Sequence, residues 1–327
     1  MNFADRLFDA VLHKRSPLVV GIDPDLRLIP SSLFDLSSAR KSARGALAQG
    51  VERFAVRIIQ AVADFACAVK PQLAYFERLG PAGLEAYEAT VECAKDHGLL
   101  VIADGKRNDI AQTAKEYAAA YLGGGGEAAK TEERDVAGWL AAADREAPKA
   151  DALTVNPYLG RDSLVPFLER LNLGQGLFVL VKTSNPSSGD LQDQVIAPAQ
   201  GPAGDTGGTR VYERVGVWLE EYNQERPGRY GYGSVGAVIG ATYPGELSSL
   251  RRLLPRTPFL IPGVGAQGAK AEDVAAGFDG KGLGAVVNVS RGILYAYREA
   301  PGISFEKAAA GRAKELQKEL AKVAGLL

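Results

Sequence analysis

The stretch LLVIADGKRNDIAQTAKEYAAAYLGG, residues 99–124, predicts a strand followed directly by a helix. Residues 99–103 are a continuous apolar run, which is typical of a parallel strand buried on both faces. Residues 108–124 carry apolar side chains at helical spacing and end at glycines, which terminate helices. Four charged residues lie at the junction: Asp104, Lys106, Arg107 and Asp109. Because desolvating a charge at the end of a buried strand is costly, these side chains need compensating partners.

The same strand–helix unit recurs along the whole chain. We expect strands at residues 16–23, 67–72, 99–106, 152–157, 177–183, 236–242, 259–265 and 285–290. Helical patterns lie between them, as in residues 44–65 and 82–98. Eightfold alternation of this kind predicts an α/β fold of the (β/α)8 or TIM barrel class. The alternative is an open doubly wound sheet, but residues 21–27, GIDPDLR, lack the glycine-rich turn that dinucleotide-binding sheets carry after their first strand.

The length of 327 residues fits one barrel domain that carries insertions. Residues 123–150 open with four glycines and continue with a charged, helical pattern, and residues 187–232 contain a stretch rich in glycine, proline and alanine at 198–208. We interpret both as insertions in βα connections of a single domain that spans residues 1–327.

Composition excludes several classes of function. With 46% hydrophobic and 24% charged residues the chain can bury a large core, and the net charge of −1 gives no electrostatic argument for a nucleic-acid partner. No apolar run approaches the length of a membrane span, and residues 1–14 have helical spacing in place of a signal-peptide core. Two cysteines exclude a disulfide scaffold and fit a reducing cytoplasm.

The sequence also disfavours histidine chemistry. The chain has only two histidines, His13 in the amphipathic opening segment and His97 at the predicted end of a helix. Both contexts are those of structural or solvated side chains. These contexts disfavour a serine–histidine triad and a multi-histidine metal site, so we expect the chemistry to use aspartate, lysine and arginine.

Unusual polar residues gather at the carboxyl ends of the predicted strands. They are Asp23, Lys70, Asp104, Lys106, Thr154, Asn156, Lys182, Ser184, Gln267 and Arg291. This is the end of a barrel at which active sites lie. Asp104 and Lys106 are two residues apart in a strand and so share one face, about 6–7 Å apart at the backbone. A buried structural ion pair is the alternative, but Lys70 and Asp23 at neighbouring strand ends favour a functional cluster.

A second signal follows the last two strands. Residues 262–268, PGVGAQG, form a glycine-rich loop after the seventh strand, and Arg291 comes where the eighth strand gives way to a helix. Backbone N–H groups, a helix N-terminus and a guanidinium together bind phosphate, and these loops are the usual phosphate position in such barrels. We therefore expect a small phosphorylated substrate.

These residues carry a resemblance to a known family. Residues 103–110, ADGKRNDI, match the Asp-x-Lys-x-x-Asp motif of the orotidine 5'-phosphate decarboxylase family. Further segments resemble the family from the first strand to the last: GIDPD (21–25), VKP (69–71), KTSNPS (182–187), GATYPGEL (240–247) and PGVGAQG (262–268). One departure is Ser290, where the family often has glycine before the phosphate-binding arginine.

The resemblance implies a decarboxylation of orotidine monophosphate to UMP, the last step of pyrimidine nucleotide synthesis, with no cofactor and no metal. Lys106 would supply the cation at the developing negative charge and then protonate C6 of the pyrimidine. Asp104 would sit against the departing carboxylate and fix Lys106, and Lys70 would orient Asp104 and touch the ribose.

The resemblance also implies the substrate-binding residues. Asp23 would bind a ribose hydroxyl, Ser184 would contact the pyrimidine edge, and Gln267 and Arg291 would hold the phosphate. Asp109 and Thr113 would reach into the site of a neighbouring subunit, which implies a homodimer with shared active sites. From the sequence alone, Asp109 and Gln112 are also spaced as a capping box that opens the next helix.

Two other functions stay open. Enzymes of the hexulose-phosphate synthase type are similar around the Asp-x-Lys motif but use magnesium and a sugar phosphate, and the KTSNPS segment and the lysine of VKP favour the decarboxylase over them. A barrel that binds a phosphorylated ligand without turnover is the hypothesis from a different class.

Overall fold

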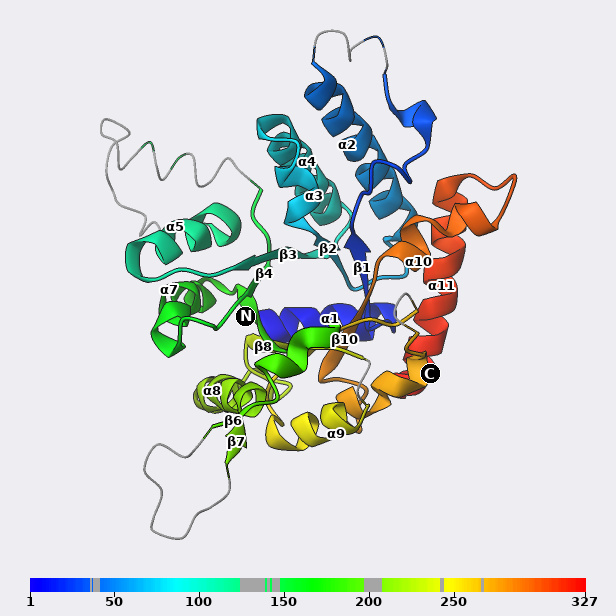
Figure 1. Ribbon diagram of the computed structural model, residues 1–327. Helices are drawn as coiled ribbons and strands as arrows, with labels where there is room; N and C mark the ends of the chain where they lie inside the picture. Colours follow the sequence, from blue (N-terminus) through cyan, green and yellow to red (C-terminus); the bar gives the residue numbers. More distant parts are fainter. Residues whose placement is uncertain are drawn as a thin grey trace, which may run out of the picture.

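The computed structural model describes residues 1–35, 37, 42–123, 139, 142, 148–196, 208–241, 244–265 and 268–327. Its centre is a closed parallel barrel with the strand order β1-β10-β9-β8-β5-β4-β3-β2 (Figure 1). The strands are β1 Leu18–Ile22, β2 Ala68–Pro71, β3 Leu100–Arg107, β4 Ala152–Val155, β5 Gly176–Lys182, β8 Val235–Ile239, β9 Phe259–Pro262 and β10 Ala285–Val289. Each coincides with one of the eight predicted strands, so the predicted (β/α)8 barrel is confirmed.

Helices cover the outer side of the barrel, and one of them, α1, lies across its end (Figure 1). They are α1 Phe3–Lys14, α2 Ala43–Val62, α3 Leu73–Glu77, α4 Pro81–Asp96, α5 Ala111–Leu122, α7 Val165–Leu168, α8 Val211–Glu225, α9 Pro244–Leu253, α10 Arg291–Leu294 and α11 Phe305–Ala324. Short 3-10 turns occur at η1 Ser31–Leu33, η3 Arg161–Leu164, η4 Glu169–Leu173, η5 Pro186–Asp190, η6 Ala271–Gly277 and η7 Ala296–Glu299. The apolar faces of the strands that point outward pack against these helices in one continuous core.

The amino-terminal helix α1 closes one mouth of the barrel. Its buried side chains, Phe3, Leu7, Phe8 and Val11 among them, form a second core with residues near the starts of the strands, such as Val19 and Ala68. Figure 1 shows α1 lying across the barrel. Because this helix covers the amino-terminal ends of the strands, only the carboxyl ends are left to form a site.

The connection between β5 and β8 is longer than the other described connections. It contains η5, an antiparallel ribbon of β6 (Val195–Ile196) and β7 (Thr209–Arg210), and α8. The sequence does not predict this ribbon. The side-chain amide of Asn223 on α8 donates to the carbonyl of Val235 at 2.7 Å and accepts from its N–H at 3.2 Å, which fixes α8 to β8. Most of residues 123–150 lie outside the described residues.

No helix among the described residues combines the length and the apolar character that crossing a bilayer requires.

The packing of α1 gives a test of the fold. Leu7 is fully buried and Leu12, on the same helix, is 39% exposed. We predict that Leu7→Ala lowers the free energy of unfolding by about 2–5 kcal/mol, because it leaves a cavity where α1 meets the barrel. Leu12→Ala is the matched control and should cost less than about 1 kcal/mol. Urea denaturation measures both, and equal losses would show that α1 is not seated as described.

Candidate active site

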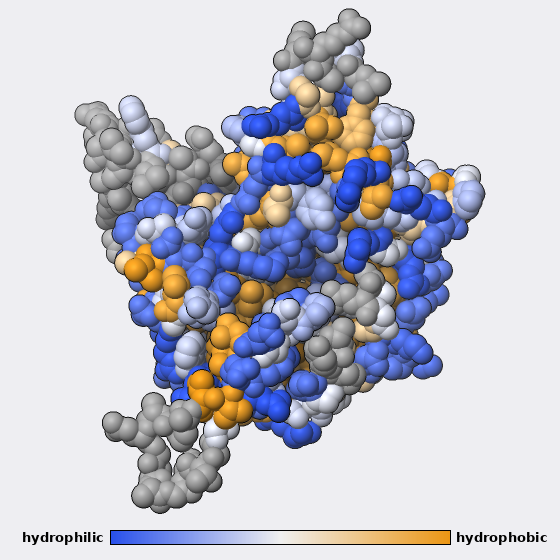
Figure 2. Space-filling model, in the orientation of Figure 1, coloured by the Kyte–Doolittle hydropathy of each residue, from blue (hydrophilic) through white to orange (hydrophobic). Residues whose placement is uncertain are grey.

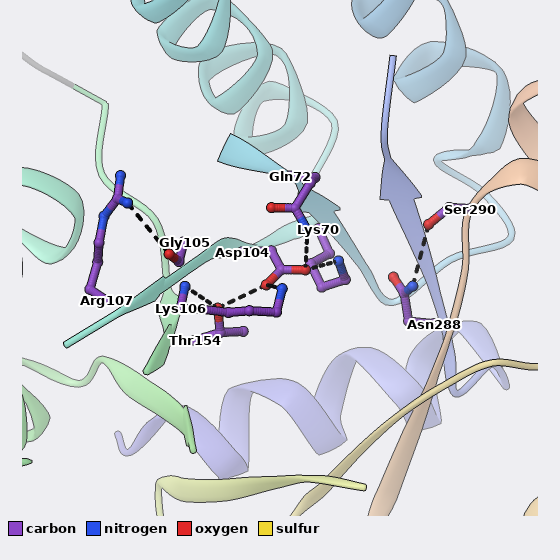
Figure 3. Close-up of polar contacts among 9 residues, drawn as sticks. All are labelled: Lys70, Gln72, Asp104, Gly105, Lys106, Arg107, Thr154, Asn288 and Ser290. Atoms are coloured by element: carbon purple, nitrogen blue, oxygen red, sulfur yellow. Dashed lines mark hydrogen bonds and ion pairs between the residues drawn. The ribbon is translucent and has the colours of Figure 1, made fainter. Parts of the chain in front are cut away.

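The carboxylate of Asp104 on β3 is the centre of the site. Its Oδ1 accepts from Lys106 Nζ at 2.6 Å and from Thr154 Oγ1 at 2.9 Å. Its Oδ2 accepts from Gln72 Nε2 at 2.9 Å and from the ammonium of Lys70. Figure 3 shows the carboxylate between Lys70 and Gln72 on one side and Lys106 and Thr154 on the other. The two carboxylate oxygens therefore have four donors, and two of these are cations.

The two lysines keep this buried carboxylate charged. Burial by itself would raise the pKa of Asp104, but the ammonium groups of Lys70 and Lys106 outweigh it and hold that pKa well below its usual range. Burial would likewise lower the pKa of Lys70, but the negative charges of Asp104 and Asp23 outweigh it and raise that pKa. Both members of the buried pair are thus ionised at neutral pH.

Lys106 lies at an irregular point in β3. The register between β3 and β4 shifts between Ala103 and Arg107, and Lys106 has a φ of 47°, which is uncommon for a residue with a side chain. Its backbone N–H donates to Thr154 Oγ1 at 2.9 Å. A strained backbone that the surrounding structure holds in place is typical of functional sites. The side chains of Asp104 and Lys106, which share one face of the strand, meet at this irregular end of β3.

A cavity of about 440 Å³ opens at the carboxyl ends of the strands and has these side chains in its wall. Lys70, Asp104, Lys106 and Thr154 form the charged side, and Leu180, Val238 and Leu260 contribute apolar wall. This volume is within the range of about 300–1,000 Å³ that small-molecule sites occupy. Lys106 is the more accessible of the two lysines, with 46% of its side chain exposed against 6% for Lys70. It is therefore the cation best placed to meet a ligand.

The structure brings four of the predicted site residues to this cavity: Lys70, Asp104, Lys106 and Ser184. Asp23 follows β1 and is half-buried, and its Oδ1 has no hydrogen-bond partner among the described residues. Its charge acts on Lys70, as the raised pKa of that lysine indicates. Arg291 is exposed at the first position of α10, and Gln267 lies outside the described residues.

Asp109 and Thr113 do not line the cavity of this chain. Thr113 is exposed on α5, and Asp109 is half-buried. The capping-box alternative is wrong, because α5 has Ile110 as its N-cap and no side-chain cap. The Asp109 carboxylate accepts from the adjacent Ile110 N–H at 2.8 Å, and the Gln112 amide donates to Glu116 instead of reaching back.

The sequence does not single out four polar residues of the cavity region: Gln72, Thr183, Asn185 and Gln192. Thr183 and Asn185 lie within the KTSNPS segment. Gln72 lies two residues after Lys70, so the alternation of side chains along a strand could have placed it on the same face. Gln192 also lines the cavity but comes from the β5–β6 connection, where no periodic pattern marks it.

Comparison with known proteins identifies the family of this chain. Residues 16–301 match the model of the orotidine 5'-phosphate decarboxylase / HUMPS family. A Rhodopirellula baltica protein named orotidine 5'-phosphate decarboxylase is 44% identical over 299 residues, which cover 91% of this chain and 90% of the relative. A Caldicellulosiruptor bescii protein of the same name is 37% identical over 322 residues, which cover 98% of each chain.

A solved structure agrees with these sequence matches. The structure of Leishmania donovani OMP decarboxylase superimposes with a TM-score of 0.70 at 29% identity, and the match covers 99% of this chain and 100% of that one. The resemblance inferred from the Asp-x-Lys-x-x-Asp motif is thereby confirmed over nearly the whole chain. This chain belongs to the orotidine 5'-phosphate decarboxylase / HUMPS family.

Proposed function

We propose that this protein decarboxylates orotidine 5'-phosphate to UMP in pyrimidine nucleotide synthesis. The observation that carries the proposal is the array of Lys70, Asp104 and Lys106 in the wall of one cavity. The names of the relatives at 44% and 37% identity support the decarboxylase branch of the family.

The chemistry follows from where the charges are fixed. In the reaction the bond between C6 of the pyrimidine and its carboxylate breaks, CO₂ leaves, and the electron pair stays on C6. The ammonium of Lys106, held by Asp104 at 2.6 Å, would stabilise this negative charge and then transfer a proton to C6. Since Asp104 is already ionised and hydrogen-bonded, the array needs no reorganisation during the reaction.

The remaining predicted residues would bind the nucleotide. We assign Asp23 and Lys70 to the ribose, which fits the buried oxygen of Asp23 that lacks a partner among the described residues. Ser184 would contact the pyrimidine edge, and Arg291 and Gln267 would hold the phosphate. Binding energy from the phosphate can then be used to position the distant reacting carbon.

We also propose a homodimer with shared sites, in which Asp109 and Thr113 serve the partner's cavity. Their position outside the cavity of their own chain supports this arrangement. We further propose that residues 1–327 form one domain with insertions in two βα connections and that the enzyme acts in the cytoplasm, as its two free cysteines favour.

The reaction itself is tested with purified protein and orotidine monophosphate, by following the loss of ultraviolet absorbance. We predict turnover that EDTA leaves unchanged. Loss of activity in EDTA would favour the magnesium-dependent sugar-phosphate chemistry of the other branch. Tight binding of UMP without any turnover would favour a barrel that only binds its ligand.

Lys106→Ala should lower turnover by at least about a thousandfold, because the cation and the proton donor are lost together. The fold should persist, since Asp104 keeps Lys70, Gln72 and Thr154 as partners. The matched control is Lys115→Ala, which removes an exposed lysine 4.0 Å from Glu169. Turnover of Lys106→Ala within tenfold of the parent would contradict the assignment.

Arg291→Ala should raise KM for orotidine monophosphate far more than KM for the phosphate-free nucleoside orotidine, because only the nucleotide loses a contact. Arg298→Ala, an exposed arginine on η7, is the control. An equal rise in KM for both substrates would mean that the phosphate binds elsewhere.

Mixing variants tests the shared site. Lys106→Ala and Asp109→Ala should each be inactive, and subunit exchange should restore about half of the activity per mixed dimer, since one of its two sites then carries neither change. Exchange demonstrated by mass tags without any recovery of activity would show that Asp109 acts within its own chain.

A further inference from the structure

One wall of the cavity is made by a segment that has little apolar packing of its own. Residues 184–193, here called the strap, run from the end of β5 toward β6, and Ser184, Asn185 and Gln192 line the cavity. Within the strap, Ser188 is the one buried residue, and Leu191 is 50% exposed. Figure 2 shows hydrophobic residues on the surface beside the β6–β7 ribbon. Polar contacts must therefore hold the strap against the barrel.

The first of these contacts is an ion pair between Lys182 and Asp193. Lys182 Nζ lies 2.5 Å from Asp193 Oδ1, and the lysine side chain is only 3% exposed, whereas that of Asp193 is 42% exposed. The Lys182 ammonium also lies 5.4 Å from the centre of the Tyr212 ring on α8. The pair joins the last residue of β5 to the last residue of the strap.

A β-bulge explains why Lys182 makes this contact and does not enter the cavity. Leu180 pairs with Val238, but Lys182 pairs with Ile239, so the register shifts by one residue between them. Val238 belongs to the inner core of the barrel and Ile239 to the outer one. The shift therefore turns Lys182 outward, toward α8 and the strap.

The second contact is a clasp between Gln192 and Thr183. The Thr183 N–H donates to Gln192 Oε1 at 2.9 Å, and Gln192 Nε2 donates to Thr183 Oγ1 at 2.8 Å. The Tyr212 N–H donates to the Gln192 carbonyl at 3.1 Å, which ties the strap to the start of α8. The end of the strap is thus held against Thr183, the residue that precedes the strap.

The position of Ser184 depends on this arrangement. Its backbone packs on Gly240, where a side chain would not fit, because a Cβ at that glycine would come within 2.8 Å of Ser184 Cβ. The Gly240 N–H donates to the Lys182 carbonyl at 2.8 Å. Ser184 therefore lies between Gly240, which follows β8, and the clasp of Thr183 and Gln192.

We propose that Lys182 is a positioning residue, whose ion pair with Asp193 holds the strap so that Ser184 and Gln192 present a fixed wall to the base of the bound nucleotide. This inference rests on the proposed function, because it takes the base to lie against the strap. The ion pair acts on the base side of the cavity and leaves the ribose and phosphate contacts unchanged.

The experiment compares inhibition by UMP with inhibition by ribose 5-phosphate, which lacks the base. Lys182→Met removes the charge and keeps the length of the side chain, and Asp193→Asn is the second variant, made at a position that is partly exposed. Each should weaken UMP inhibition about tenfold, which corresponds to about 1.4 kcal/mol, and change ribose 5-phosphate inhibition less than twofold. In the Lys182→Met background, a further Ser184→Ala change should weaken UMP inhibition much less than the same change does in the parent protein.

The control is Glu221→Gln, which breaks the ion pair of Arg161 and Glu221 on α8 and should change neither inhibition constant. Equal weakening of both inhibitors by Lys182→Met and Asp193→Asn would overturn the proposal, because it would indicate a general structural loss. Unchanged UMP inhibition in both folded variants would also overturn it. Failure of the parent protein to turn over orotidine monophosphate would instead refute the proposed function. In that case, the affinities of the parent and the two variants for UMP and ribose 5-phosphate, measured directly, would still test whether the strap forms a wall against the base.

Discussion

The site depends on one buried negative charge. Asp104 is 5% exposed and would be costly to bury alone, but it accepts from two ammonium groups, an amide and a hydroxyl. These donors come from β2, β3 and β4 and the residue that follows β2 by one position. Three neighbouring strands must therefore keep their register for the charge to be tolerated, and in return the charge fixes the cation of Lys106 at the cavity.

The two ends of the barrel have different roles, because one is closed by apolar packing and the other holds the cavity. At the amino-terminal end, α1 closes the barrel with apolar side chains such as Phe3 and Leu7. At the carboxyl end the strands carry charged and polar residues around the 440 Å³ cavity. Stability and chemistry are thus placed at opposite ends of the same strands, as is usual in barrels of this class.

Two lysines at strand ends point in different directions because of a backbone irregularity in β5. Lys106 lies two residues after Asp104 on the same face of β3 and meets it at the cavity, whereas the bulge in β5 turns Lys182 outward to Asp193. Both lysines come at the end of an apolar strand in the sequence, so the pattern of residues does not distinguish them. The register of hydrogen bonds between neighbouring strands makes the distinction.

The sequence by itself determined the eight strands, the barrel and the cluster of Lys70, Asp104 and Lys106, because apolar runs and the two-residue period of a strand are local properties of the chain. It did not determine the role of Gln192, the ribbon of β6 and β7, or the absence of a capping box at Asp109. Those depend on contacts between residues far apart in the chain, or on the backbone angle with which α5 begins. Only the tertiary structure decides such features, because a bulge or a turn changes the direction of a side chain without leaving a periodic signal in the sequence.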